Sequence, residues 1–418
     1  MKSAGLILCA KPEDAADVHR VFHNAKRLDD LVIFDAEGKM RCNFLNCMKR
    51  PRDAVTLLTT FSETLKRGDS KGGGDSSRFY DAQEDRTIYH AVTALRAANE
   101  PLIGINIHRF ITTAATTSAE LLTREWQAKY HSKVLEKGFD AKKTPMESHD
   151  YELCQDFWIT EWPSVMDHKT RGNILAGVQG TLHTLNSGIV REMCSGETNC
   201  SPADVLAGKW VLVNFPPSTW GASGLLISVG WKLLVQLAVL ERHATDKDPF
   251  VTIWCDEAHQ FVVPGSDSAF LAQCRSHMGC LFCLTQSTSS FYAAMKGEGG
   301  KHQADALLAN FSHVIVHACD PVSAKWAASK LGRRKEILYS GSSSPSHNAS
   351  IWDQINGRQQ TSASFSEHYE NVLQEQEFMI GRTGGPANGL IADSVVIRSG
   401  EPFANGQNYL RVPWSQRG

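Results

Sequence analysis

Two adjacent carboxylates, Asp256 and Glu257, directly follow the apolar run 250–255. A short apolar run that ends in polar side chains is typical of a buried β-strand. At the end of a Walker B strand in a nucleotide-hydrolysing domain, the first carboxylate holds Mg²⁺ through water. The second polarises the water that attacks the γ-phosphate. We therefore predict that Asp256 and Glu257 are catalytic and that Asp256 is the magnesium ligand. A solvated strand end is the alternative.

A second apolar run, 281–284, ends at Thr285 and Gln286, and Arg275 lies just before it. RecA-like motor domains have this order along the chain: a strand that ends in carboxylates, then an arginine, then a strand that ends in Thr-Gln. In that arrangement Thr285 contacts the nucleotide and Gln286 senses the γ-phosphate. Arg275 then acts as an arginine finger on a neighbouring subunit. The alternatives are a hydrogen-bonded strand cap for Gln286 and an ordinary surface arginine.

The matching phosphate-binding loop is missing from the sequence. A P-loop needs Gly-x-x-x-x-Gly-Lys followed by Ser or Thr, so that backbone N–H groups and the lysine surround the phosphates. The three Gly-Lys pairs lack both the following hydroxyl and the preceding glycine: 38–39, 208–209 and 300–301. We therefore expect ATP and Mg²⁺ to bind only if a P-loop is supplied from elsewhere, and no nucleotide turnover by this chain alone.

Composition limits the possible partners. The 418 residues carry a net charge of −2, so any contact with nucleic acid must come from local patches or from assembly into a ring. Several of the eleven cysteines sit inside apolar runs, which indicates reduced, buried thiols. Cys280 and Cys283 form a C-x-x-C pair, but the odd offset on a strand points them to opposite faces. We therefore expect no zinc or redox site there.

The order of apolar runs predicts an α/β fold, a RecA-like, P-loop NTPase-type parallel sheet flanked by helices, with an inserted all-helical domain. No signal peptide is visible. The apolar stretch 225–240 contains Lys232 and Gln236 and indicates a buried helix rather than a membrane span. The predicted divisions are the start of the motor domain (1–80), the helical insertion (81–200), the rest of the motor domain (201–340), a Ser-rich linker (341–370) and a C-terminal tail (371–418).

Several of these stretches together resemble the conjugative DNA-transfer coupling proteins of type IV secretion, the TraG/TraD type with its TraM-recognition domain. The resemblance covers nearly the whole chain and is carried by 10–12, 214–216, 231–236, 256–261, 275–276, 284–287, 310–332 and 378–388. It implies a hexameric ring that hydrolyses ATP and moves single-stranded DNA or a DNA–protein conjugate. It also implies relaxosome and type IV secretion proteins as partners, and a cytoplasmic place at the inner face of the bacterial inner membrane.

The chain departs from that family in lacking the P-loop and the N-terminal membrane anchor. By position, the missing P-loop should lie just before Met1, so we expect a fragment or a second polypeptide that carries the rest. Two rival interpretations stay open. One is a non-catalytic recognition module that keeps the motor fold and docks relaxosome or secretion partners. The other is a different ring ATPase that packages or processes DNA, against which the resemblance of the helical insertion and the tail argues.

Overall fold

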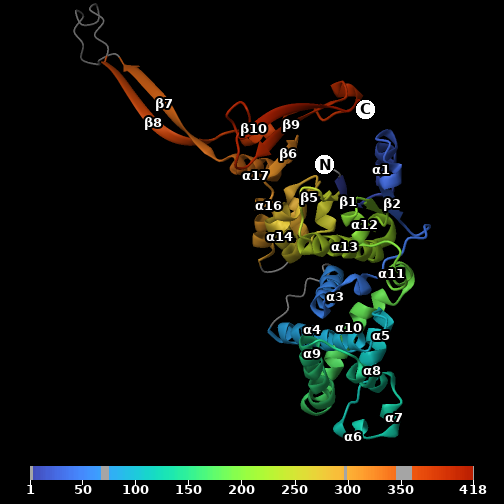
Figure 1. Ribbon diagram of the computed structural model, residues 1–418. Helices are drawn as coiled ribbons and strands as arrows, with labels where there is room; N and C mark the ends of the chain where they lie inside the picture. Colours follow the sequence, from blue (N-terminus) through green and yellow to red (C-terminus); the bar gives the residue numbers. More distant parts are fainter. Residues whose placement is uncertain (1–2, 67–74, 296–298, 345–359, 418) are drawn as a thin grey trace, which may run out of the picture. The chain divides into compact units, whose positions relative to one another are not determined.

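The computed structural model describes residues 3–66, 75–295, 299–344 and 360–417 (Figure 1). The chain forms two compact units. The first unit comprises residues 1–285 and 291–310, and the second comprises residues 286–290 and 311–418.

A five-stranded sheet forms the centre of the first unit, with the strand order β2-β3-β1-β4-β5. Every neighbouring pair of strands is parallel. The strands are β1 (Ser3–Leu8), β2 (Leu31–Phe34), β3 (Trp210–Val213), β4 (Phe250–Cys255) and β5 (Gly279–Cys283). The predicted α/β fold with a parallel sheet is therefore confirmed. Parallel sheets of this kind are normally covered by helices on both faces, which explains the continuous apolar runs in the sequence.

The two faces of this sheet differ in how they are covered. On one face Ile7 lies beside Leu212 and Trp254 in the strand register. Helix α1 (Pro12–Asn24) covers Ile7 and Leu212 with Phe22. On the other face Leu6 and its neighbours are fully buried against helix α13 (Pro217–Glu241).

Helix α13 is the one described helix that is long and apolar enough to span a membrane. Of its most apolar stretch, 72% is buried inside the protein. Trp231 on α13 makes edge-to-face contacts with Phe34 and Phe44. Gly230 permits this packing, because a Cβ atom there would lie only 2.4 Å from the Phe44 ring. The helix therefore packs as a core element, as the sequence indicates.

Every secondary-structure element described between β2 and β3 is helical, which confirms the presence of a helical insertion (Figure 1). Its core stacks Phe110 on His131 and packs Trp158 edge-on against both. Helix α3 (Pro51–Lys66) packs against α4 and α13, so it links the insertion to the sheet. The other helices between β2 and β3 are α2 (Phe44–Cys47), α4 (Asp75–Ala97), α5 (Gly104–Thr112), α6 (Ser118–Leu121), α7 (Arg124–Gln127), α8 (Tyr130–Asp140), α9 (Pro145–Gln155), η2 (Asp156–Val165), α10 (His168–Leu185), α11 (Gly188–Cys194) and α12 (Pro202–Leu206).

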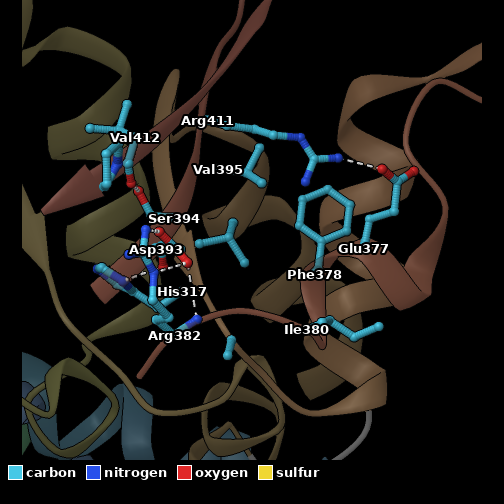
Figure 2. Close-up of a pocket in the computed structure, with 13 residues that line it drawn as sticks. His317, Glu377, Phe378, Ile380, Arg382, Asp393, Ser394, Val395, Arg411 and Val412 are labelled. Atoms are coloured by element: carbon cyan, nitrogen blue, oxygen red, sulfur yellow. Dashed lines mark hydrogen bonds and ion pairs between the residues drawn. The ribbon is translucent and has the colours of Figure 1, made fainter. Parts of the chain in front are cut away.

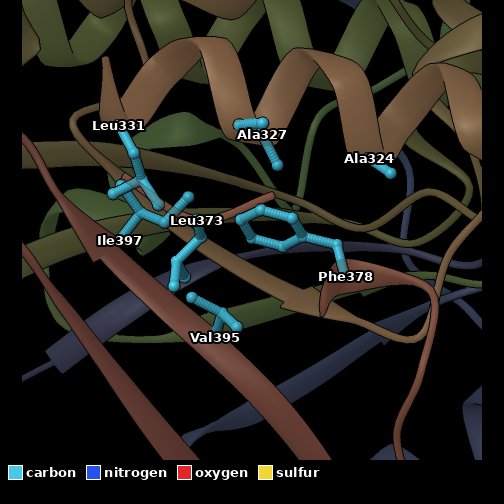
Figure 3. Packing of buried hydrophobic residues seen from close by; sticks show 8 residues of the cluster. Ala324, Ala327, Leu331, Leu373, Phe378, Val395 and Ile397 are labelled. Carbon is cyan, nitrogen blue, oxygen red and sulfur yellow. The ribbon is translucent and has the colours of Figure 1, made fainter. Parts of the chain in front are cut away.

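The second unit has its own three-stranded antiparallel sheet, with the order β10-β9-β6. Strand β6 (His313–His317) pairs with β9 (Ile391–Arg398) and does not extend the parallel sheet. Figure 3 shows Phe378 between Val395 of this sheet and the α17 helix (Pro321–Leu331), with Leu331 of α17 beside Ile397. The third strand is β10 (Tyr409–Ser415).

The predicted Ser-rich linker, 341–370, is wrong at both of its ends. The segments β7 (Arg333–Ser344) and β8 (Gln360–Asn371) form an antiparallel hairpin that pairs from Arg333↔Asn371 to Ser344↔Gln360. β-Branched and aromatic residues such as Ile337, Tyr339 and Phe365 favour strands, and the serines between them obscured that signal. The rest of the predicted linker, 345–359, lies outside the described residues.

Candidate nucleotide site

The carboxyl ends of β1, β4 and β5 lie side by side, and Asp256 and Glu257 directly follow the middle one, β4. The backbone joins the segments that follow β4 and β5. The Leu284 N–H donates to the Cys255 carbonyl oxygen (3.0 Å), and the Ala258 N–H donates to the Leu284 carbonyl oxygen (2.8 Å). Ligands of open α/β sheets bind outside the carboxyl ends of the strands, so both carboxylates occupy the functional edge.

Glu257 has a left-handed backbone conformation, with φ 43° and ψ 50°. Non-glycine residues rarely adopt this conformation, and such strain tends to persist at functional sites. The Glu257 side chain is buried, with Oε1 lying 3.9 Å from Lys11 Nζ and Oε2 lying 3.6 Å from His259 Nδ1. The fold therefore fixes one carboxylate between two side chains that can carry positive charge.

Asp256 lies in an environment that disfavours its charged form. Its Oδ1 accepts a hydrogen bond from the Glu257 N–H at 3.0 Å. Burial, together with the negative charges of Asp14 and Glu257, nevertheless raises the pKa of Asp256 above its ordinary value. A cation bound beside Asp256 would relieve this excess of negative charge, which fits the expected role of holding Mg²⁺ through water.

Lys11 and Asp14 belong to this edge of the sheet, although the sequence did not single them out as site residues. Lys11 is the N-cap residue of α1, and Asp14 Oδ2 accepts hydrogen bonds from the N–H groups of Ala10 and Lys11, both at 2.8 Å. The Lys11 side chain then extends to Glu257. Their place in the sequence could have indicated this role, because Lys11 follows the carboxyl end of β1, the parallel strand next to β4.

Thr285 is two residues past the end of β5, directly after the Leu284 contact with the β4 segment. Gln286 is the first residue of the segment 286–290, which belongs to the second unit. This segment is anchored there, because the Thr288 N–H donates to Ser323 Oγ at 3.0 Å. The covalent link between Thr285 and Gln286 therefore connects the strand of one unit to an anchored segment of the other.

Arg275 is not brought to the carboxylates of its own chain. It lies in the short helix η4 (Cys274–His277), on the surface, just before β5 begins. The Val251 N–H donates to the Met278 carbonyl oxygen at 2.9 Å, which places this segment at the amino ends of β4 and β5. Asp256 follows the carboxyl end of β4, so Arg275 and Asp256 lie at opposite ends of the strands.

A buried polar network holds the chain just after Glu257. Nζ of Lys232 on α13 donates to the Phe261 carbonyl oxygen (2.6 Å) and to Asp267 Oδ2 (2.7 Å). The same Asp267 oxygen accepts from the Val263 N–H at 2.7 Å, and Asp267 Oδ1 accepts from Gln236 Nε2 at 2.7 Å. Asp267 belongs to α14 (Pro264–Gln273). The network therefore fixes the loop that carries Glu257 to two helices.

A cavity of about 300 Å³ in the second unit contains none of these residues. Figure 2 shows Arg382 paired with Asp393, and Arg411 paired with Glu377, along its wall. The paired charges satisfy one another, so we assign no ligand to this cavity. In the described part of the chain, no group of three or more His, Cys, Asp and Glu side chains already surrounds a point as metal ligands would.

The parallel sheet, its interior strand β4 that ends in two carboxylates, and the helical insertion define a RecA-like α/β fold. Solved structures of a conjugative coupling protein share it. The unbound monoclinic form of the bacterial conjugative coupling protein TrwBdeltaN70 matches with a TM-score of 0.59 and 12% identity, covering 100% of this chain and 78% of the other. Plasmid coupling protein TrwB in complex with ADP and Mg²⁺ matches with a TM-score of 0.58 and 12% identity, over 100% and 79% of the chains. No family model and no curated protein sequence matches this chain.

Proposed function

We propose that this chain is a coupling-protein-like ATPase motor segment for DNA transfer in conjugation or type IV secretion. The observation that carries the proposal is the placement of Asp256 and Glu257 at the functional edge of a fold shared with TrwB. A structure of TrwB holds ADP and Mg²⁺. In this chain the same acidic edge fits a magnesium–nucleotide complex, but the sequence lacks the loop that would cradle the phosphates.

A strand, P-loop and helix supplied from elsewhere would have a place to bind on the sheet. Among the described residues β5 is the edge strand of this sheet, and on the face beside it Trp254 and Phe282 stack on each other and are 36% and 39% exposed. An apolar face of a parallel sheet is normally covered by a helix. We infer that a further strand pairs with β5 and that its helix covers Trp254 and Phe282.

The handedness of strand connections supports this position. The connection from β1 to β2 through α1 crosses the sheet in one direction, with α1 on the face that carries Ile7. A connection from a strand beyond β5 to β1 would cross in the same direction. Because such connections are right-handed, its helix would lie on the same face as α1. That face also carries Trp254 and Phe282.

In the completed site Asp256 would hold Mg²⁺ through water and Glu257 would orient the attacking water. Thr285 would contact the nucleotide, and Gln286 would sense the γ-phosphate. Arg275, at the other end of the sheet, would act on the site of a neighbouring subunit in a homo-hexamer. The substrate would be single-stranded DNA or a DNA–protein conjugate, delivered with relaxosome and secretion proteins at the cytoplasmic face of the inner membrane.

The test is phosphate release by the chain alone and by the chain fused to a strand–P-loop–helix segment before Met1, each with and without single-stranded DNA. We expect background turnover from the chain alone and DNA-stimulated turnover from the fusion. Robust turnover by the chain alone, abolished by Glu257→Gln, would contradict the need for an added phosphate loop. A folded fusion that binds ATP and never hydrolyses it would contradict the motor assignment.

A second candidate is a non-catalytic module that docks relaxosome or secretion partners. It is favoured by the apolar side chains on one face of the β7–β8 hairpin, where Tyr339 pairs with Phe365 and both are exposed. We expect Tyr339→Ser with Phe365→Ser to weaken binding to purified relaxosome proteins if this candidate holds. Unchanged binding of those proteins would argue against it.

A further inference from the structure

Two thiols lie side by side where the chain leaves β2 and enters the helical insertion. The Sγ atoms of Cys42 and Cys47 are 3.7 Å apart, and one thiol donates a hydrogen bond to the other. Cys42 directly precedes the N-cap residue of α2, and Cys47 is the last residue of that short helix. The sulfurs of a disulfide lie about 2.0 Å apart, so the two atoms need to approach by only about 1.7 Å.

Backbone hydrogen bonds anchor the turn that carries this pair. The Cys42 N–H donates to the Met193 carbonyl oxygen at 3.0 Å, and the Cys47 N–H donates to the Asn43 carbonyl oxygen at 3.0 Å. The Asn43 N–H donates to Thr198 Oγ1 at 2.9 Å. These contacts hold the backbone at both cysteines, so rotation about their side-chain torsions alone would close the remaining distance between the sulfurs.

The two thiols differ in exposure and in acidity. Cys42 is fully buried, whereas Cys47 is partly exposed to solvent. The hydrogen bond with Cys42 lowers the pKa of the Cys47 thiol; burial opposes this effect, and a hydrogen bond with Thr198 adds to it. The same bond between the thiols, together with burial, raises the pKa of Cys42. Because the thiolate is the reactive form, Cys47 is suited to meet an oxidant and Cys42 to resolve the product.

We propose that Cys47 is an oxidation site and that it forms a reversible disulfide with Cys42. The Cys47 thiolate attacks hydrogen peroxide: an S–O bond forms, the O–O bond breaks, and the leaving hydroxide takes up a proton to become water. The Cys42 thiol then attacks the sulfenic sulfur of Cys47. The S–S bond forms, the S–O bond breaks, and the hydroxyl leaves with the Cys42 proton as a second water. The two thiols thereby give two electrons to the peroxide.

Two other partly exposed cysteines lack this combination of acidity and a thiol partner. Burial raises the pKa of the Cys280 thiol, and it raises the pKa of Cys319 to about 11. Their sulfurs donate to oxygen acceptors: Cys280 to Thr252 Oγ1 at 3.6 Å, and Cys319 to the Phe378 carbonyl oxygen at 3.5 Å. Both thiols therefore stay protonated at neutral pH, which makes them suitable controls.

The position of the pair gives the disulfide a structural consequence. Phe44 and Leu45 lie between the two cysteines and are buried, and Phe44 packs edge-on against Trp231 of α13. The bond would close the turn that seats the start of the insertion on the core of the first unit. Disulfides that form in a reducing compartment are reduced again, as in redox-sensing pairs, so the turn would alternate between an open and a closed form.

The test treats the full chain, first reduced and then freed of reductant, with an equimolar amount of hydrogen peroxide. Peptide mass mapping after alkylation identifies the oxidised cysteines. We expect a Cys42–Cys47 disulfide as the main product and its disappearance when dithiothreitol is added. Before oxidation, iodoacetamide at neutral pH should label Cys47 several-fold faster than Cys280 or Cys319, because only Cys47 has a lowered pKa among these three.

Substitutions separate the two roles. Cys42→Ser should leave Cys47 as a sulfenic acid that dimedone traps, whereas Cys47→Ser should leave the buried Cys42 unoxidised. The matched controls Cys280→Ser and Cys319→Ser should form the disulfide as the unaltered chain does. If a serine variant does not fold, mapping of the unaltered chain still decides. Three results would overturn the proposal: labelling of Cys47 no faster than that of Cys319, oxidised Cys47 without an S–S bond, or a main disulfide that joins other cysteines.

Discussion

Trp254 and Phe282 stack with their ring centroids 4.2 Å apart and their planes 7° apart, on the half of the parallel sheet that α1 leaves uncovered. Exposed apolar patches beside an unpaired strand edge promote association between chains.

We predict that Phe282→Asp shifts the isolated chain toward the monomer and raises its soluble concentration several-fold. Light scattering at a series of concentrations measures this. Val21→Asp, at an exposed apolar residue on α1, is the control and should change little. Equal association of the two variants would mean that another surface is responsible.

In the fusion that supplies the P-loop, Glu257→Gln should leave ATP bound and unhydrolysed. The amide keeps the size of the side chain but orients the attacking water poorly, so the expected loss is about 10²–10⁴-fold in turnover. Asp256→Ala should in addition weaken Mg²⁺-dependent binding. Nucleotide binding by fluorescence and turnover by phosphate release separate the two effects. Equal and mild effects of both substitutions would count against their assigned roles.

Asp256→Asn should stabilise the isolated chain at neutral pH. The pKa of Asp256 is raised in the folded state above its ordinary value of 3.8, mainly by burial, so ionisation of Asp256 destabilises the folded chain. This cost is present at neutral pH and disappears as the pH falls and the carboxyl becomes protonated. The neutral amide removes that cost, and we expect the melting temperature to rise by about 1–2 °C at pH 7. The gain should shrink as the pH approaches 4. A gain that is constant with pH would point to packing rather than charge.

Arg275→Ala should matter only in an assembled ring, because Arg275 lies at the opposite end of the strands from Asp256. In the fusion we expect nearly unchanged ATP affinity and hydrolysis lower by ~10³-fold or more, as for other arginine fingers. Mixing this variant with Glu257→Gln should restore part of the activity, since some interfaces then pair an intact arginine with an intact carboxylate. No recovery in rings that exchange subunits would show that Arg275 does not act across the interface.

Lys232→Met should strongly destabilise the first unit. Lys232 and Asp267 form a 2.7 Å ion pair with only 2% and 3% of their side chains exposed, and removal of one partner leaves a buried charge. The expected cost is about 3–5 kcal/mol in urea unfolding. Adding Asp267→Asn should recover part of it, because the amide is neutral. Lys325→Met, at an exposed lysine on α17, is the control and should stay within about 0.5 kcal/mol. A loss no larger than this control would mean that the pair does not hold the loop.

Some features could be predicted from the sequence because they depend on neighbouring residues. The apolar runs 250–255 and 281–284 located the strands β4 and β5, and the carboxylates Asp256 and Glu257 directly follow β4. The hairpin β7–β8 was missed for a local reason as well. Serines interrupt the pattern of strand-forming residues in both segments. Each segment forms a strand because it pairs with the other, whose paired residues are more than fifteen positions away in the sequence.

The sequence by itself determined the fold class, the acidic strand end and the lack of a phosphate loop. Each of these can be recognised from short stretches of consecutive residues. Only the tertiary structure decided which distant residues meet. It brought Lys11 to Glu257 and placed Arg275 at the far end of the strands. The physical reason is that strand order and the packing of one segment on another depend on contacts across the whole chain, which local composition does not encode.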